Sequence, residues 1–204
     1  MWWRALALGN TFEMAVFLET DRMTLSWFRE TDADLLFDLD NDPLVMRYIN
    51  GGLPVEQTEV ASQLSYWLTT YPADGRFGFW RADEKTTGQF VGWFHLRPRL
   101  GEDPSRPELG YRMCRAAWGK GLATEGSRAL IDMGFRQLPV NQVYATTMAV
   151  NLASRRVMEK AGLRIERSFI ADWPIRIVGD DVGGVEYAVT RPQWEQDQKV
   201  DESN

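Results

Sequence analysis

The most regular pattern of hydrophobic and polar positions lies between Val55 and Tyr71. Apolar residues recur there at steps of four, three, one and three, at Val60, Leu64, Trp67, Leu68 and Tyr71. This spacing places the five side chains on one face of an amphipathic helix. Pro72 and Gly75 follow at the point where the helix is expected to end.

Other segments alternate between apolar and polar residues or are rich in β-branched and aromatic residues, which is typical of strands. Strands are expected over residues 23–28, 77–80, 90–96, 109–114, 142–148, 163–170 and 185–189. Further helices are expected over residues 31–39, 43–48, 122–138 and 151–161. Strands and helices in this order favour one mixed central sheet with helices on both faces.

Capping residues support these helix boundaries. Asp42-Pro43 supplies an N-cap followed by a first-turn proline, and Asn151 is an N-cap for the helix that follows it. Gly162 suits the C′ position at the end of that helix. The chain therefore carries local signals for most of its turns.

Composition narrows the class of protein. The 204 residues are 44% hydrophobic and 25% charged, which suits one soluble domain. A net charge of −6 argues against a nucleic-acid partner, and no apolar run is long enough to cross a membrane. A single cysteine, Cys114, and a single histidine, His95, argue against a disulfide framework and a zinc site. With no signal peptide recognised at the start, the cytoplasm is the expected location.

The segment from Leu109 to Phe135 reads as a strand, a glycine turn and a helix. Gly119-Lys120-Gly121 leaves backbone N–H groups free at a helix N-terminus, where the helix dipole also favours an anion. A P-loop would need Ser or Thr where Gly121 follows the lysine, and a dinucleotide fingerprint would need a glycine at Thr124. The turn is therefore interpreted as a pyrophosphate site of another kind.

Two ordered motifs carry a family resemblance. They are Gly110-Tyr111 with Trp118-Gly119-Lys120-Gly121-Leu122-Ala123-Thr124-Glu125, and Asn151-Leu152-Ala153-Ser154-Arg155-Arg156-Val157-Met158-Glu159-Lys160-Ala161-Gly162-Leu163. Together they resemble the GNAT N-acetyltransferase superfamily, and residues 19–25 and 42–47 are similar to its RimJ/RimL-like branch of ribosomal-protein-alanine N-acetyltransferases. The resemblance covers residues 18–190. It implies an α+β fold with a twisted, mostly antiparallel central sheet and helices on both faces.

The resemblance also implies a domain layout and a co-substrate. The N-acetyltransferase domain would span residues 18–192, between an N-terminal extension (1–17) and a polar C-terminal tail (193–204), which is expected to fray from Glu195 onward. Acetyl-CoA would be the co-substrate, without a metal. The residues expected to contact it are Met113, Cys114 and Arg115 along the pantetheine, Trp118, Gly119, Lys120, Gly121, Leu122, Ala123 and Thr124 at the pyrophosphate, and Asn151 and Ser154 at the pantetheine arm and the thioester sulfur.

Catalysis needs a base, because the amine attacks only when neutral. The resemblance places Glu108 in that role, although a solvated strand-end acid is an equally good interpretation. Many relatives carry a tyrosine acid where Met158 stands, so Ser154 or water must assist the departing thiolate. Ser154 is equally well explained as a small residue that lets the cofactor approach, and Glu125 as a first-turn residue that favours the helix.

The expected function is direct acetyl transfer to an amine, on either a protein N-terminus or a small molecule. Residues 47–53, 98–107 and 172–184 are expected to face the acceptor, with Asp180, Asp181 and Glu186 as candidates for a cationic one. A larger acyl group such as succinyl, an inactive CoA-binding regulator, and a nucleotide-dependent enzyme stay open as alternatives. A homodimer is also left open.

Overall fold

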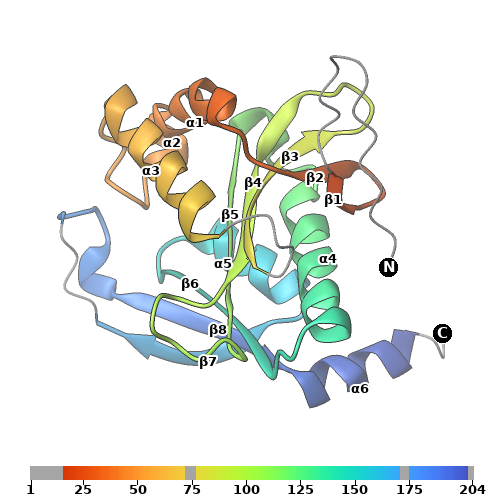
Figure 1. Ribbon diagram of the computed structural model, residues 1–204. Coiled ribbons are helices and arrows are strands. Elements are labelled where there is room, and N and C mark those ends of the chain that lie inside the picture. The colour runs from red at the N-terminus through yellow and green to blue at the C-terminus, as the bar shows by residue number, and fades with distance from the viewer. Residues whose placement is uncertain (1–15, 72–76, 171–174, 202–204) are drawn as a thin grey trace, which may run out of the picture.

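The computed structural model describes residues 16–71, 77–170 and 175–201. One eight-stranded sheet runs through it in the order β1-β2-β3-β4-β5-β6-β8-β7 (Figure 1). The strands are β1 Val16–Glu19, β2 Met23–Trp27, β3 Gly78–Glu84, β4 Phe90–Arg97, β5 Glu108–Met113, β6 Gln142–Met148, β7 Arg164–Phe169 and β8 Gly184–Thr190. Among the strands of the described residues, only β5 and β6 pair in parallel, which confirms the mostly antiparallel mixed sheet.

Helices cover both faces of this sheet. They are α1 Ala33–Asp40, α2 Pro43–Met46, α3 Gln57–Thr70, α4 Leu122–Gln137, α5 Leu152–Lys160 and α6 Arg191–Asp201, with short 3-10 turns η1 Glu30–Asp32, η2 Arg115–Ala117 and η3 Asp180–Val182. The expected amphipathic face of α3 is the one that is buried, through Val60, Leu64 and Trp67. The expected N-caps are also present, because Asp42 accepts a bond from the Leu44 amide and Asn151 from the Ser154 amide.

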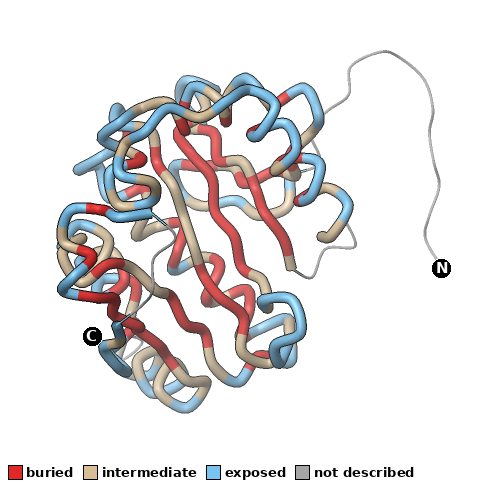
Figure 2. Tube along the Cα trace, turned by 90° about the vertical axis from the view of Figure 1, so that its left-hand side faces the viewer, coloured by how far each residue is buried: buried red, intermediate tan, exposed pale blue. Residues whose placement is uncertain are grey.

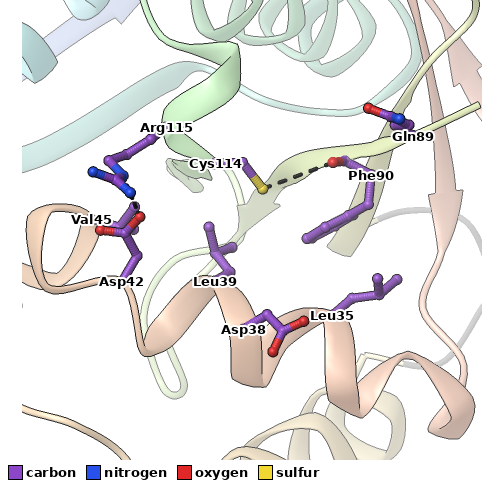
Figure 3. A pocket seen from close by; sticks show the side chains of 9 residues that line it. All are labelled: Leu35, Asp38, Leu39, Asp42, Val45, Gln89, Phe90, Cys114 and Arg115. Atoms are coloured by element: carbon purple, nitrogen blue, oxygen red, sulfur yellow. Dashed lines mark hydrogen bonds and ion pairs between the residues drawn. The ribbon is translucent and has the colours of Figure 1, made fainter. Parts of the chain in front are cut away.

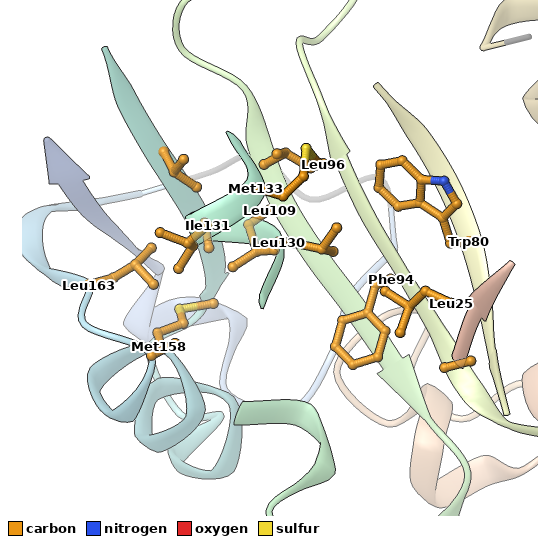
Figure 4. Packing of buried hydrophobic residues seen from close by; sticks show 14 of the residues in the cluster. Leu25, Trp80, Phe94, Leu96, Leu109, Leu130, Ile131, Met133, Met158 and Leu163 are labelled. Atoms are coloured by element: carbon orange, nitrogen blue, oxygen red, sulfur yellow. The ribbon is translucent and has the colours of Figure 1, made fainter. Parts of the chain in front are cut away.

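Alternate residues of β4 point to opposite faces of the sheet and contribute to two separate hydrophobic cores. Trp93 packs with α1 and α3, whereas Phe94 and Leu96 pack with α4 on the opposite face. Figure 4 shows Leu130, Ile131 and Met133 of α4 beside the side chains of the central strands. Buried segments accordingly run along the middle of the sheet in Figure 2, with exposed segments around them. The central strands are therefore fixed from both sides.

The sheet opens between β5 and β6. Their ladder consists of one residue pair, Glu108 with Tyr144, whereas β6 pairs with β8 over all seven of its residues from Gln142 to Met148. Beyond that single pair the two strands run apart (Figure 1). The edge of β5 toward its C-terminus is left without a neighbouring strand on the β6 side, immediately before the glycine turn.

Two terminal predictions need correction. Val16 and Phe17, assigned to the N-terminal extension, belong to β1, because Phe17 stacks on Trp80 with ring centroids 4.3 Å apart. The C-terminal tail, expected to fray from Glu195, is helical as far as Asp201 and forms part of α6. Trp194 holds it by packing on Phe135 of α4 and donating to Asp132, 2.6 Å away. Residues 1–15 and 202–204 lie outside the described part of the chain.

Candidate active site

The glycine turn presents a row of free amides. Gly119 and Gly121 have φ of 73° and 79°, a left-handed conformation that L side chains rarely adopt, and Gly121 is the N-cap of α4. In the described chain, the N–H groups from Gly119 to Thr124 donate no hydrogen bond, and the first helical bond is from Glu125 to the Gly121 carbonyl, 3.0 Å. The amide of Trp118 is not part of this row, because it donates to the Arg115 carbonyl (3.0 Å). The free amides therefore begin at Gly119, one residue after Trp118, where the predicted anion site begins.

The turn is fixed by Glu125 and by the β1–β2 connection. Glu125 accepts hydrogen bonds from the Thr20 hydroxyl (2.6 Å) and from the amide and side chain of Arg22, whose Nη1 also donates to the Lys120 carbonyl (2.8 Å). Partial burial raises the pKa of Glu125, but the bonds from Thr20 and Arg22 outweigh it and leave the pKa below its ordinary value. Glu125 thus has the structural role that its first-turn position suggests.

The predicted pantetheine residues at the end of β5 direct their backbone groups to opposite sides, toward β4 or toward β6. The Cys114 amide donates to the Val91 carbonyl of β4 (3.0 Å), so it is not free for a ligand. Neighbouring residues of a strand direct their backbone groups to opposite sides, so those of Met113 face the opening toward β6. The indole of Trp118 already donates to the Met113 carbonyl at 2.9 Å.

The side chains of Cys114 and Arg115 lie on the α1–α2 side of the sheet. They line a cavity of about 340 Å³ together with Leu35, Asp38, Leu39, Asp42, Val45, Gln89 and Phe90 (Figure 3). Arg115 pairs there with Asp42 at 2.6 Å. Burial raises the pKa of the Cys114 thiol, so this cysteine is not activated as a nucleophile.

The first turn of α5 brings three polar groups together. Asn151 Oδ1 accepts from the Ser154 amide (3.2 Å), while its Nδ2 forms no bond with the described residues. Tyr111, from β5, places its hydroxyl 3.0 Å from both the carbonyl oxygen and Oγ of Ser154. Tyr111 carries the resemblance in the motif Gly-Tyr, but its contact with α5 was not predicted from the sequence.

Glu108 is not the solvated acid that its strand-end position allowed. It is 8% exposed and accepts two bonds from Arg99, at 2.6 Å and 3.1 Å, with Arg97 at 3.5 Å and the Thr146 hydroxyl at 3.3 Å. Burial raises the pKa of its carboxyl, but the Arg99 hydrogen bond and the two guanidinium charges outweigh it and hold the pKa below its ordinary value. The Arg99 side chain itself is 46% exposed.

His95 lies beside this cluster but is held as a packed ring. Its ring stacks with Trp93 and meets Phe79 edge to face, and it lies opposite Gly110, where an added Cβ would come within 2.4 Å of the ring. Burial lowers the pKa of His95 to about 3, and the attraction of Glu108 does not compensate. The imidazole is therefore neutral at neutral pH, and a structural role explains it best.

Comparison with known proteins decides the family. The family model for the acetyltransferase (GNAT) domain matches residues 22–164. The chain belongs to the GNAT acetyltransferase family. Acetyl-CoA is the co-substrate of this family's N-acetyltransferases, and the row of free amides fits its pyrophosphate.

Individual relatives of this GNAT protein support the same family. A protein of Aspergillus fumigatus named FsC-acetyl coenzyme A-N(2)-transacetylase is 34% identical over 192 residues, covering 89% of this chain and 79% of its own. RimL, the ribosomal L7/L12 alpha-N-protein acetyltransferase solved with coenzyme A, has a TM-score of 0.71 at 13% identity, over 86% of this chain and 97% of its own. Aminoglycoside acetyltransferase AAC(6')-Ib, also with coenzyme A, has a TM-score of 0.67 at 21% identity, over 85% and 98%. These two structures show the shared fold.

The acids expected to attract a cationic acceptor are mostly neutralised in this GNAT domain. Glu186 is 2% exposed and pairs with Arg106 (2.5 Å) and Arg167 (2.9 Å). Asp180 is buried, pairs with Arg176 (3.2 Å) and accepts from the Ile177 amide (3.1 Å). Asp181 alone of the three is exposed. Part of the predicted acceptor segment, residues 172–174, lies outside the described residues.

Among the described residues, no group of three or more His, Cys, Asp or Glu side chains is arranged to hold a metal ion. None of the helices described is both long and apolar enough to cross a lipid bilayer.

Proposed function

We propose that this GNAT protein transfers the acetyl group of acetyl-CoA to a primary amine of a small molecule. The observation that carries the proposal is the row of free amides from Gly119 to Thr124, placed where β5 and β6 part. Pyrophosphate oxygens accept from such amides at a helix N-terminus. The attached pantetheine would then have the open edge of β5 beside it, and the Asn151 Nδ2 group at the start of α5 would be its hydrogen-bond donor.

We favour a small acceptor because this chain is more similar in sequence to the Aspergillus fumigatus transacetylase than to RimL. The 34%-identical relative has a name that specifies one numbered nitrogen, N(2), of its acceptor. RimL acts on a protein N-terminus according to its description but shares only 13% of residues with this chain. A protein N-terminus is therefore the second candidate, and the RimJ/RimL-like branch stays a prediction.

Glu108 is the proposed base, acting directly or through a water molecule. Its carboxylate is ionised at neutral pH and is already hydrogen-bonded to a cation, the Arg99 guanidinium. Arg99 is about half exposed, so an incoming ammonium group can displace it from Glu108. The ammonium gives one proton to the carboxylate, and the neutral amine nitrogen then bonds the acetyl carbon and loses its second proton to water. The C–S bond breaks with its electron pair going to sulfur, near the hydroxyl of Ser154.

The first experiment is titration calorimetry with CoA on the purified full chain. We expect binding by the wild type and none by Gly119→Val, because valine is strained at φ 73° and blocks approach to the amides. Gly88→Val is the matched control, since Gly88 has φ 67°, also has no atom within 4 Å of an added Cβ, and lies in the β3–β4 turn. Absence of CoA binding by the wild type would reject the site.

The second experiment follows release of free thiol from acetyl-CoA with a panel of small amines and peptides. Turnover with small amines supports the proposal. Turnover confined to peptides would favour the protein acceptor, and faster turnover with succinyl-CoA would favour a larger acyl group. Binding of CoA without any turnover would indicate a CoA-binding regulator.

A further inference from the structure

Tyr111 connects the two sides of the opening between β5 and β6. It lies on β5, which borders the opening, and its hydroxyl reaches the first turn of α5, 43 residues later in the chain. The phenolic oxygen is 3.0 Å from the Ser154 carbonyl oxygen and 3.0 Å from Ser154 Oγ. No other hydroxyl group is present among the side chains of α5, because its sequence is LASRRVMEK.

The arrangement restricts where the two hydroxyl hydrogens point. Tyr111 has one hydrogen to donate, so it bonds either the Ser154 carbonyl or Ser154 Oγ. In the second case Oγ is occupied as an acceptor and the serine keeps its own hydrogen for another group. Met158, one turn further along the same helix, is 3% exposed in the core and offers no donor.

We propose that Tyr111 is a positioning residue for acetyl transfer, which holds the Ser154 hydroxyl so that its hydrogen is directed to the departing sulfur. This inference rests on the proposed function. As the amine nitrogen bonds the acetyl carbon, the C–S bond breaks and its electron pair stays on sulfur. Tyr111 then donates to Ser154 Oγ and Ser154 donates to the sulfur, while the first proton of the ammonium has gone to Glu108 and the second is lost from the nitrogen to water.

The two hydroxyls act as hydrogen-bond donors, and no proton is transferred through them. Burial raises the pKa of Tyr111 above its ordinary value near 10, whereas a thiol has a pKa of about 8.5. Transfer of the phenolic proton to the thiolate is therefore unfavourable, and the thiolate takes its proton from solvent after release. Stabilising the charge that develops on sulfur lowers the barrier without net transfer.

The test is a double-mutant cycle on the full-length enzyme with Tyr111→Phe, Ser154→Ala and the double variant. Each single variant is expected to lose about tenfold in kcat, the size of one hydrogen bond, with an unchanged Kd for CoA by calorimetry. The double variant is expected to lose no more than either single one, because the two hydroxyls act as one unit. Unchanged kcat in Tyr111→Phe, or losses that multiply in the double variant, would overturn the inference.

Tyr187→Phe is the matched control. Tyr187 also holds α5, through Glu159 (2.8 Å) and Arg155 (3.1 Å), but from β8 and without contact to Ser154. It is expected to change the unfolding free energy and not kcat. An equal loss of kcat in Tyr187→Phe would mean that Tyr111 merely anchors the helix. An inactive wild type rejects the proposed function itself, whereas an active wild type with an indifferent Tyr111→Phe rejects only this inference.

Discussion

The ionic partners of an acidic side chain near the β5–β6 opening decide whether its charge is neutralised. Glu108 looks like an ordinary strand-end acid in the sequence, but two arginines from the segment just before it surround its carboxylate. Two arginines, Arg106 and Arg167, likewise pair with the Glu186 carboxylate and neutralise its charge. Which acid is available to a substrate is thus decided by the arginines that face it.

Arg99 should set the pH dependence of turnover. Its hydrogen bonds lower the pKa of Glu108, so Arg99→Gln is expected to raise that pKa and to move the acidic limb of the kcat/KM profile to higher pH. The measurement is the pH–rate profile with a saturating acyl donor. Arg164→Gln, which removes a surface pair with Asp197, is the control and should leave the limb in place. A limb that does not move in Arg99→Gln would remove Glu108 from the role of base.

Among the elements, α4 is the one whose position matters most, because its first turn supplies three of the free amides. It approaches β4 closely at Gly126, where an added Cβ would lie 2.3 Å from Phe94 Cζ. Further along the same helix, Gly134 leaves more room, with Leu96 Cδ2 at 3.1 Å. The helix therefore approaches the sheet more closely near its N-terminal end, which carries the free amides, than at Gly134.

We expect Gly126→Ala to destabilise the protein by about 1–3 kcal/mol through overpacking against a buried ring, although alanine is the better helix former by about 1 kcal/mol. CoA affinity should fall with it, because the first turn of α4 shifts. Urea unfolding and calorimetry measure the two effects. Gly134→Ala is the matched control, where the flexible leucine can yield and the change should be much smaller. Equal stability of the two variants would contradict this account of how α4 is held.

At the scale of the whole molecule, the two halves of the sheet meet through one backbone pair, and helices hold them together. The core under α4 joins residues from β2 to β8 on one face. Arg191, at the start of α6, adds bonds to the carbonyl oxygens of Phe135 (2.6 Å), Leu138 (3.1 Å) and Val140 (2.7 Å). The first residue of α6 thereby binds the carbonyl oxygens at and just after the C-terminal end of α4, and links α4 to β8, which ends at Thr190.

Arg191→Ala should lower the unfolding free energy by about 2–4 kcal/mol, because it leaves these carbonyl oxygens without their donor. Equilibrium denaturation in urea measures the loss. Arg156→Ala, on the exposed face of α5, is the control and should change stability by less than about 0.5 kcal/mol. A comparable loss in both variants would mean that Arg191 has no special role, and that α6 is the frayed tail first expected.

The sequence by itself determined the features that depend on neighbours along the chain. Helical and alternating periodicity, the Asn151 and Asp42 caps, and the glycine turn before α4 are local properties, and each is present where predicted. The segments missed, β1 and α6, have weak local signals and are held by distant partners, Trp80 and α4.

Only the tertiary structure decided how the site is assembled. β5 and β6 separate after one residue pair. The Arg99–Glu108 pair and the contact of Tyr111 with Ser154 join residues from different parts of the chain, up to 43 positions apart. No periodicity encodes these contacts, because they depend on how strands and helices pack in three dimensions. The glycine turn and its helix were therefore readable in the chain, whereas the contacts of Glu108 and Tyr111 were not.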